Sequence, residues 1–163
     1  MAGPEADGDT EGRALAPGHY LFEDLAIGDH WPTGAMTLTE SQFVAFAGLS
    51  GDFFDLHMDD DYARELGFPS RVAHGILGLA LLDGLKNRAD VRLAAIVSLG
   101  WDWNFRAPLL VGDRIRAHAW VSQLRPTSRP ERGFIELTLQ LTRNGDAVAQ
   151  EGVNRMLIRR RAG

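Results

Sequence analysis

Asp52 and His57 place a carboxylate and an imidazole five positions apart in a segment without regular hydrophobic periodicity. The missing period predicts an ordered loop, and catalytic side chains concentrate in loops held by a rigid scaffold. At one site, such a pair can do general acid–base work, because one group deprotonates water while the other delivers a proton. The spacing also arises by chance, so the alternatives are a turn residue at Asp52 and a structural histidine at His57.

His74 and Gly75 stand at the start of the apolar segment 75–87. If this segment is a helix, the N–H of Gly75 has no intrahelical acceptor and lies at the positive end of the helix dipole. Such a donor can polarise a carbonyl oxygen, and the missing side chain of Gly75 allows a ligand to approach closely. For His74 we favour a structural role, in which a hydrogen bond orients the loop.

Helices are predicted on both sides of the loop that carries Asp52. Thr39 is typical of an N-cap with Gln42 as its capping-box partner, and helical spacing of apolar residues continues from there to Gly51. A short helix is expected at residues 59–66. The segment 75–87 is apolar nearly all round, and a helix of that kind is buried on most sides.

The second half of the chain alternates in hydrophobicity, which indicates strands. Trp101, Trp103 and Phe105 recur at period two, and Asn144-Gly145 is typical of a hairpin turn. Strands are expected at residues 32–38, 94–106, 114–124, 133–143 and 147–159. Antiparallel strands that follow a buried helix predict an α+β fold with a sheet wrapped around the helix.

Composition excludes several classes of protein. The formal net charge of −5 argues against a nucleic-acid partner, because such proteins need a basic surface to neutralise phosphates. The chain has no cysteine, which excludes disulfides, thiolate catalysis and cysteine-ligated metals. Hydrophobic residues make up 45% and charged residues 24% of 163 residues, as expected for one globular domain.

Residues 1–18 are predicted to form a disordered tail, because they are acidic, rich in Gly, Pro and Ala, and offer little to bury. Residues 19–163 are predicted to form the single domain. The N-terminus has neither the basic nor the apolar region of a secretory signal, and no apolar run approaches the ~18 residues that cross a membrane. We therefore expect a cytoplasmic protein without a membrane partner.

The other titratable residues predict no metal site. The three aspartates at residues 59–61 lack the alternating ligand spacing of a calcium loop, and acids at a helix N-terminus explain them better. His19, His30 and His118 have no partner pattern and are expected to be incidental.

Two motifs together resemble the MaoC-like dehydratases, a family that includes the R-specific enoyl-CoA hydratases. The first family pattern is Gly/Ser-Asp-x-Asn-Pro-(apolar)-His, followed at a fixed interval by His-Gly at the start of a central helix. The second is Phe-x-x-Pro followed by an apolar pair and Gly-Asp. The matching residues here are Gly51, Asp52, Leu56, His57, His74 and Gly75, then Phe105, Pro108, Val111, Gly112 and Asp113. The resemblance covers residues 20–160.

The resemblance implies a hotdog fold, with a long antiparallel sheet curled around the central helix and usually two such units in a dimer. It implies a lyase that adds water to a 2-enoyl thioester of CoA or a carrier protein, or the reverse dehydration, with R stereochemistry and no further cofactor. Asp52 and His57 would activate the water, and the N–H of Gly75 would hold the thioester oxygen.

Two departures from the family pattern concern the substrate. Phe54 and Asp55 replace the family's Asn and Pro, so Phe54 is expected to narrow or re-line the binding pocket. Asp83 stands where related hydratases often have serine, and an acid in so apolar a helix must find a partner or take up a proton. We expect Asp83 to face the catalytic loop, where it would tune Asp52 or contact a polar substrate.

Two other functions compete with the hydratase. A hotdog thioesterase would hydrolyse the same thioester bond, and thioesterases of this fold usually place their acid on the central helix, as Asp83 would be. The loop pair of Asp52 and His57 favours the hydratase. The third possibility is a non-catalytic domain that binds acyl thioesters.

Overall fold

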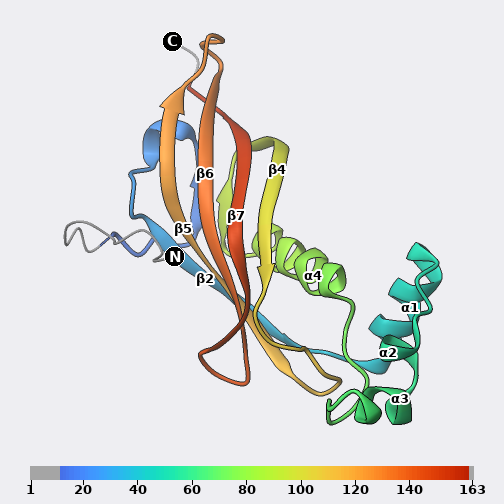
Figure 1. Ribbon diagram of the computed structural model, residues 1–163. Coiled ribbons are helices and arrows are strands. Elements are labelled where there is room, and N and C mark those ends of the chain that lie inside the picture. The colour runs from blue at the N-terminus through green and yellow to red at the C-terminus, as the bar shows by residue number, and fades with distance from the viewer. Residues whose placement is uncertain (1–11, 162–163) are drawn as a thin grey trace, which may run out of the picture.

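The computed structural model describes residues 12–161, in which five long strands form an antiparallel sheet beside one long helix (Figure 1). The strand order is β2-β5-β6-β7-β4. The strands are β2 (His30–Thr37), β4 (Ala95–Phe105), β5 (Arg114–Pro126), β6 (Arg132–Arg143) and β7 (Ala147–Arg159). The helix α4 (Gly75–Asn87) lies along one face of this sheet, which is the predicted α+β architecture.

The shorter elements lie around this frame. Strand β1 (Gly18–Tyr20) pairs in parallel with β3 (Val91–Leu93), and a short 3₁₀ helix spans Phe22–Asp24. The three short helices are α1 (Glu40–Ser50), α2 (Asp55–Met58) and α3 (Asp60–Glu65). Figure 1 shows them grouped beyond the N-terminal end of α4, away from the sheet. None of the described helices is long and apolar enough to cross a membrane.

Alternation along the strands builds the core between sheet and helix. On β5, Ile115, Ala117 and Ala119 are fully buried, and the residues between them are less buried. The two faces of a strand alternate with period two, so one face of the sheet carries the apolar side chains. Burying each large aliphatic side chain contributes about 1.5–3 kcal/mol. The same face of β6 adds Ile135, Leu137, Leu139 and Leu141.

Helix α4 has the predicted bounds and packs on the sheet as expected. Leu77, Leu82 and Leu85 pack into the core, whereas Ile76 is 62% exposed. The sheet covers one side of the helix, so part of its apolar surface stays exposed in the single chain. The apolar residues on the open side remain available to another surface.

Helix α1 begins and ends where the sequence predicted. The backbone N–H of Thr39 donates to Oε1 of Gln42 at 2.7 Å, which is one half of the capping box. Gly51 ends the helix with φ of 78°, a left-handed conformation that glycine adopts without strain. The expected loop after Gly51 instead contains the single turn α2, and Asp59 caps α3 by accepting from the N–H groups of Asp61 and Tyr62.

The ordered domain begins before residue 19, the predicted boundary. Arg13 pairs with Asp29 at 2.8 Å, and the N–H of Leu15 donates to the carbonyl of His30. The side chain of Leu15 is buried in the core. Residues 12–18 are thus held by long-range contacts that their local composition does not reveal, and the rest of the predicted tail lies outside the described residues.

Candidate active site

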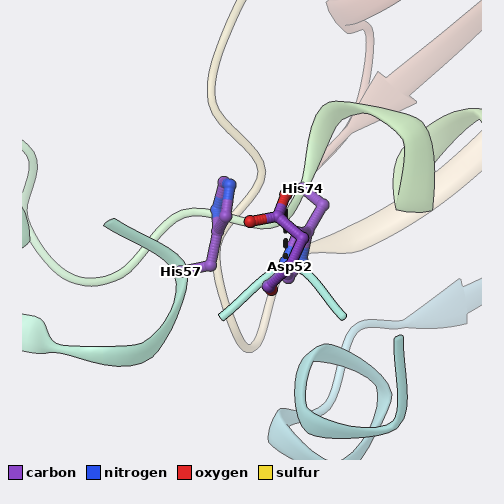
Figure 2. A group of neighbouring side chains, drawn as sticks. All are labelled: Asp52, His57 and His74. Atoms are coloured by element: carbon purple, nitrogen blue, oxygen red, sulfur yellow. Dashed lines mark hydrogen bonds and ion pairs between the residues drawn. The ribbon is translucent and has the colours of Figure 1, made fainter. Parts of the chain in front are cut away.

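Asp52, His57 and His74 meet beside the start of α4. Asp52 follows α1, His57 belongs to α2 and His74 is the N-cap of α4. One ligand-type atom from each of the three side chains lies within 4.8 Å of the others. Figure 2 shows a carboxylate oxygen of Asp52 directed toward the ring of His57. The two loop residues that the sequence singled out therefore converge, as a shared water would require.

The ring of His57 is held by a backbone carbonyl. Its Nδ1 lies 2.7 Å from the oxygen of Val72, and because a carbonyl only accepts, Nδ1 carries the proton. In the neutral ring, Nε2 then has a free lone pair. The edge of Phe54 meets the ring at a centroid distance of 6.0 Å. The hydrogen bond to Val72 therefore fixes the tautomer in which Nε2 can accept a proton.

His74 ties the segment that carries Asp52 to the start of α4. Its Nε2 donates to the backbone oxygen of Asp52 at 2.8 Å and lies 3.9 Å from carboxylate atom Oδ2 of the same residue. Its ring packs against His57, with 3.8 Å between centroids, and against Phe46. His74 is 3% exposed, and its Nδ1 has no hydrogen-bond partner among residues 12–161. The buried ring thus holds Asp52 through the main chain.

Asp52 itself is open to solvent on one side. Its side chain is 52% exposed, and Oδ1 accepts a hydrogen bond from the N–H of Phe54 at 3.2 Å. The other oxygen remains on the side of the histidines. Because Gly51 turns the chain sharply at the end of α1, Asp52 enters the space between α1 and α4.

A cavity of about 330 Å³ adjoins this group. It is bordered by His57 and by Gly75, the first residue of α4. A Cβ atom at Gly75 would lie 2.7 Å from the ring of Phe105, so any other residue there would displace that ring. The remaining lining is mostly apolar and comprises Leu56, Phe68, Val72, Ala73, Phe105, Arg106, Ala107, Pro108, Leu109 and Gln150.

The same three side chains are of the types that ligate metals, and one ligand-type atom from each lies within 4.8 Å of the others. One nitrogen of His57 and one of His74 are engaged with backbone carbonyls. The remaining nitrogen of His57 and the carboxylate of Asp52 can together hold one water by hydrogen bonds.

Comparison with known proteins identifies the family. Residues 25–142 match the family model described as the MaoC like domain. This chain belongs to the MaoC-like domain family. It is 32% identical to an (R)-specific enoyl-CoA hydratase of Rhodospirillum rubrum over 81% of this chain and 87% of the relative. It is also 32% identical to an (R)-specific enoyl-CoA hydratase of Aeromonas caviae, over 69% of this chain and 80% of the relative.

Solved structures support the same assignment for this MaoC-like chain. The (R)-hydratase of A. caviae involved in PHA biosynthesis superposes with a TM-score of 0.69 at 28% identity, covering 83% of this chain and 98% of that protein. The MaoC-like dehydratase of R. rubrum gives a TM-score of 0.79 over 88% of this chain and 99% of that protein, at 24% identity. The predicted family, hotdog fold and hydro-lyase class are confirmed.

Asp83 does not lie beside Asp52 and His57 in this MaoC-like domain. Its Oδ1 lies 2.7 Å from Nζ of Lys86, and its Oδ2 accepts from Asn87 at 3.2 Å. It stands eight residues after Gly75, about 12 Å along the helix at 1.5 Å per residue. The carboxylate of Asp83 thus pairs with a lysine on its own helix. The expected contact between Asp83 and Asp52 is absent among the described residues.

The ring of Phe54 packs nearly perpendicular to the rings of His57 and Tyr62. Its side chain is 51% exposed. It does not border the cavity directly, although its neighbour Leu56 does. Phe54 therefore occupies the position of the Asn in the family pattern. Its ring packs against one side of the His57 ring.

Sequence reasoning missed Gln150, which borders the cavity from β7. It is 2% exposed and joins Trp103 to Gly75 by two hydrogen bonds. The only sign in the sequence was a polar residue inside a predicted strand. Alternation predicts which face of the sheet such a residue lies on, but it does not predict which residue it contacts.

A second histidine pair was also missed, on β2 and β5. Nδ1 of His30 lies 3.0 Å from Nε2 of His118, whose ring stacks on Trp120 at 4.1 Å between centroids. Burial and, second, the nearby His30 lower the pKa of His118. The two histidines are 88 residues apart in sequence, so only the pairing of their strands brings them together. The expectation that His30 and His118 have no partner is therefore wrong.

Proposed function

We propose that this MaoC-like domain adds water to the double bond of a 2-enoyl thioester and catalyses the reverse dehydration of a 3-hydroxyacyl thioester. The observation that carries the proposal is the convergence of Asp52 and His57 on one spot beside the cavity that Gly75 borders. The relatives named (R)-specific enoyl-CoA hydratase and 3-hydroxybutyryl-CoA dehydratase support the reaction and its R stereochemistry.

In the hydration direction, Asp52 and His57 hold one water by hydrogen bonds. Nε2 of His57 carries the lone pair that takes a proton from this water, because Nδ1 is bonded to Val72. The water oxygen forms a bond to the β carbon, and the electrons of the double bond move toward the thioester carbonyl. The proton that Nε2 of His57 took from the water then goes to the α carbon, which completes the addition of H and OH and restores the neutral ring.

Negative charge develops on the thioester oxygen when the enolate forms. The backbone N–H of Gly75 is the donor that would hydrogen-bond to this oxygen. As the first residue of α4 it has no intrahelical acceptor and lies at the positive end of the dipole. A donor fixed in advance stabilises such charge without reorganisation. Gly75 borders the same cavity as His57, so one bound thioester can meet both groups.

The cavity favours an acyl group that is mainly apolar. Its lining is supplied largely by aliphatic and aromatic side chains, and its volume of about 330 Å³ is that of a small ligand site. Arg106 is the one Lys, Arg, Asp or Glu among the residues that border the cavity, and it pairs with Glu151 at 2.9 Å. We assign CoA or a carrier protein as the thiol portion of the substrate.

We also propose that two copies of the chain form a homodimer through β4. This strand ends the sheet, so one of its edges has no neighbouring strand among the described residues. Ile96, Val97 and Leu99 on β4 are 40–55% exposed, and Ile76 is exposed on α4. An apolar edge strand of this length is normally paired or covered. A second copy would satisfy the edge and bury the open side of the helix.

The reaction is tested with a panel of enoyl- and 3-hydroxyacyl-CoAs of increasing chain length. A hydratase removes the enoyl absorbance without releasing free thiol, whereas a thioesterase releases thiol from the same substrates. Wild type is compared with Asp52→Asn and His57→Ala, which change the reacting groups and leave the core intact. Equal turnover by all three proteins, or release of thiol alone, would contradict the proposal.

A further inference from the structure

Gln150 is clamped between two elements that border the proposed site. Its Oε1 accepts from the indole Nε1 of Trp103 at 3.0 Å, and its Nε2 donates to the backbone oxygen of Gly75 at 3.1 Å. The indole N–H can only donate and the carbonyl can only accept, so the amide has one satisfied orientation. The side chain is 2% exposed. This bridge therefore fixes the first residue of α4 to strands β4 and β7.

Two glycines of α4 make the space for this bridge. A Cβ atom at Gly78 would lie 2.2 Å from Nε2 of Gln150, so the amide fills the position of that missing side chain. At Gly75, a Cβ atom would meet the ring of Phe105. The first turn of α4 is thus packed tightly on the sheet at its glycines, whereas a Cβ at Gly84 near the other end of the helix would meet nothing within 4 Å.

We infer that Gln150 is a positioning residue for the oxyanion donor, an inference that rests on the proposed function. By holding the Gly75 carbonyl, its amide sets the rotation and height of the first helical turn, and with them the direction of the Gly75 N–H. Preorganised donors lose their effect when they shift by about an ångström. Gln150 acts on the donor to the thioester oxygen, and charge on that oxygen develops in the transition state. Loss of Gln150 should therefore destabilise the transition state more than the bound substrate.

The test uses two variants that disturb the bridge by different routes. Gln150→Met keeps the length of the side chain but removes the donor to Gly75. Gly78→Ala keeps Gln150 but displaces its amide, because the new methyl would occupy the position of Nε2. Gly84→Ala is the matched control, since it adds the same methyl to the same helix at a position where nothing in the single chain lies within 4 Å.

We expect kcat for hydration to fall about tenfold or more in Gln150→Met and Gly78→Ala, with KM changed less than about twofold. The control Gly84→Ala should keep kcat within about twofold of wild type. Thermal unfolding of each variant shows whether it is folded at the assay temperature. If either bridge variant raises KM while kcat is unchanged, or leaves both constants unchanged, the inference is overturned.

A second measurement separates this inference from the reaction itself. The ¹H–¹⁵N signal of the Gly75 amide should shift in Gln150→Met and in Gly78→Ala, and stay in place in Gly84→Ala, whether or not a substrate is known. If wild type turns over no thioester, the proposed function fails while the amide signal still reports on positioning. An unmoved Gly75 signal in both bridge variants would overturn the role of Gln150 even in an active hydratase.

Discussion

The molecule contains two pairs of neighbouring histidines, and the groups that surround the two pairs differ. His57 and His74 pack at 3.8 Å between centroids where three helices meet, with a carboxylate beside them. His30 and His118 stack at 5.2 Å on adjacent strands, and Nδ1 of His30 lies 3.0 Å from Nε2 of His118. In the part of the chain that the structure describes, no carboxylate completes this second pair into a group of three.

The two pairs differ in which ring nitrogens are already hydrogen-bonded. In the sheet pair, the two imidazoles bond to each other, which uses one nitrogen of each ring. At the helix start, His57 and His74 each bond to a backbone carbonyl and keep the other nitrogen. Adjacency of histidines is therefore a weak sign of a site. A backbone-fixed tautomer, a nearby carboxylate and a cavity beside a helix N-terminus are the informative features.

The largest effect is expected at His57. His57→Ala should lower kcat by about 10²–10⁴-fold, the range for loss of a general base, because Nε2 of His74, the other nitrogen near Asp52, donates to a backbone carbonyl and so has no lone pair to offer. Unfolding should change little, since the ring is only partly buried. Steady-state hydration kinetics together with thermal unfolding check this. A fully active His57→Ala protein would show that the two histidine pairs do not differ in the way described.

An intermediate effect is expected at His74. His74→Phe keeps a ring against Phe46 but removes the hydrogen bond to the Asp52 carbonyl. We expect kcat to fall about 10- to 100-fold through misplacement of Asp52, with about 1 kcal/mol lost from the free energy of unfolding. Kinetics and denaturant unfolding of the same sample measure both. A loss of stability with unchanged kcat would mean that the bond serves the fold alone.

The smallest effect is expected at His118, and it concerns stability. Because the folded protein lowers the pKa of His118, the unfolded chain binds its proton more readily as pH falls below about 6.5. This group therefore favours the folded state fully above that pH and loses its contribution as pH falls toward the folded pKa. His118→Gln should leave kcat unchanged and reduce the drop in Tm between about pH 7.5 and pH 5.5.

The control for this experiment is wild type at both pH values, followed by thermal unfolding. A drop in Tm that is equally large in His118→Gln would assign the pH dependence to other groups. A fall in kcat above pH 7 would instead show that the sheet pair takes part in catalysis, which would remove the contrast between the two pairs.

The sequence determined the long helices, the five strands of the main sheet and the pair of Asp52 and His57, because these depend on local signals. It did not reveal the short elements α2, β1 and β3. Alternation predicted the bounds of β4 to β7 to within two residues. Gly51 marked the C-terminal end of α1, and Gly75 marked the start of α4. Asp52 and His57 could be named because a short segment carries both, and the motif spacing gave the family that comparison confirmed.

Only the tertiary structure decided which distant side chains meet. It joined Gln150 to Gly75 across 75 residues, paired His30 with His118, and turned Asp83 toward Lys86. It also drew Leu15 into the core. A side chain's partner depends on strand register and helix rotation, which the whole core sets by close packing. Local sequence therefore supplies the chemistry of each residue, and packing selects the neighbours among which that chemistry acts.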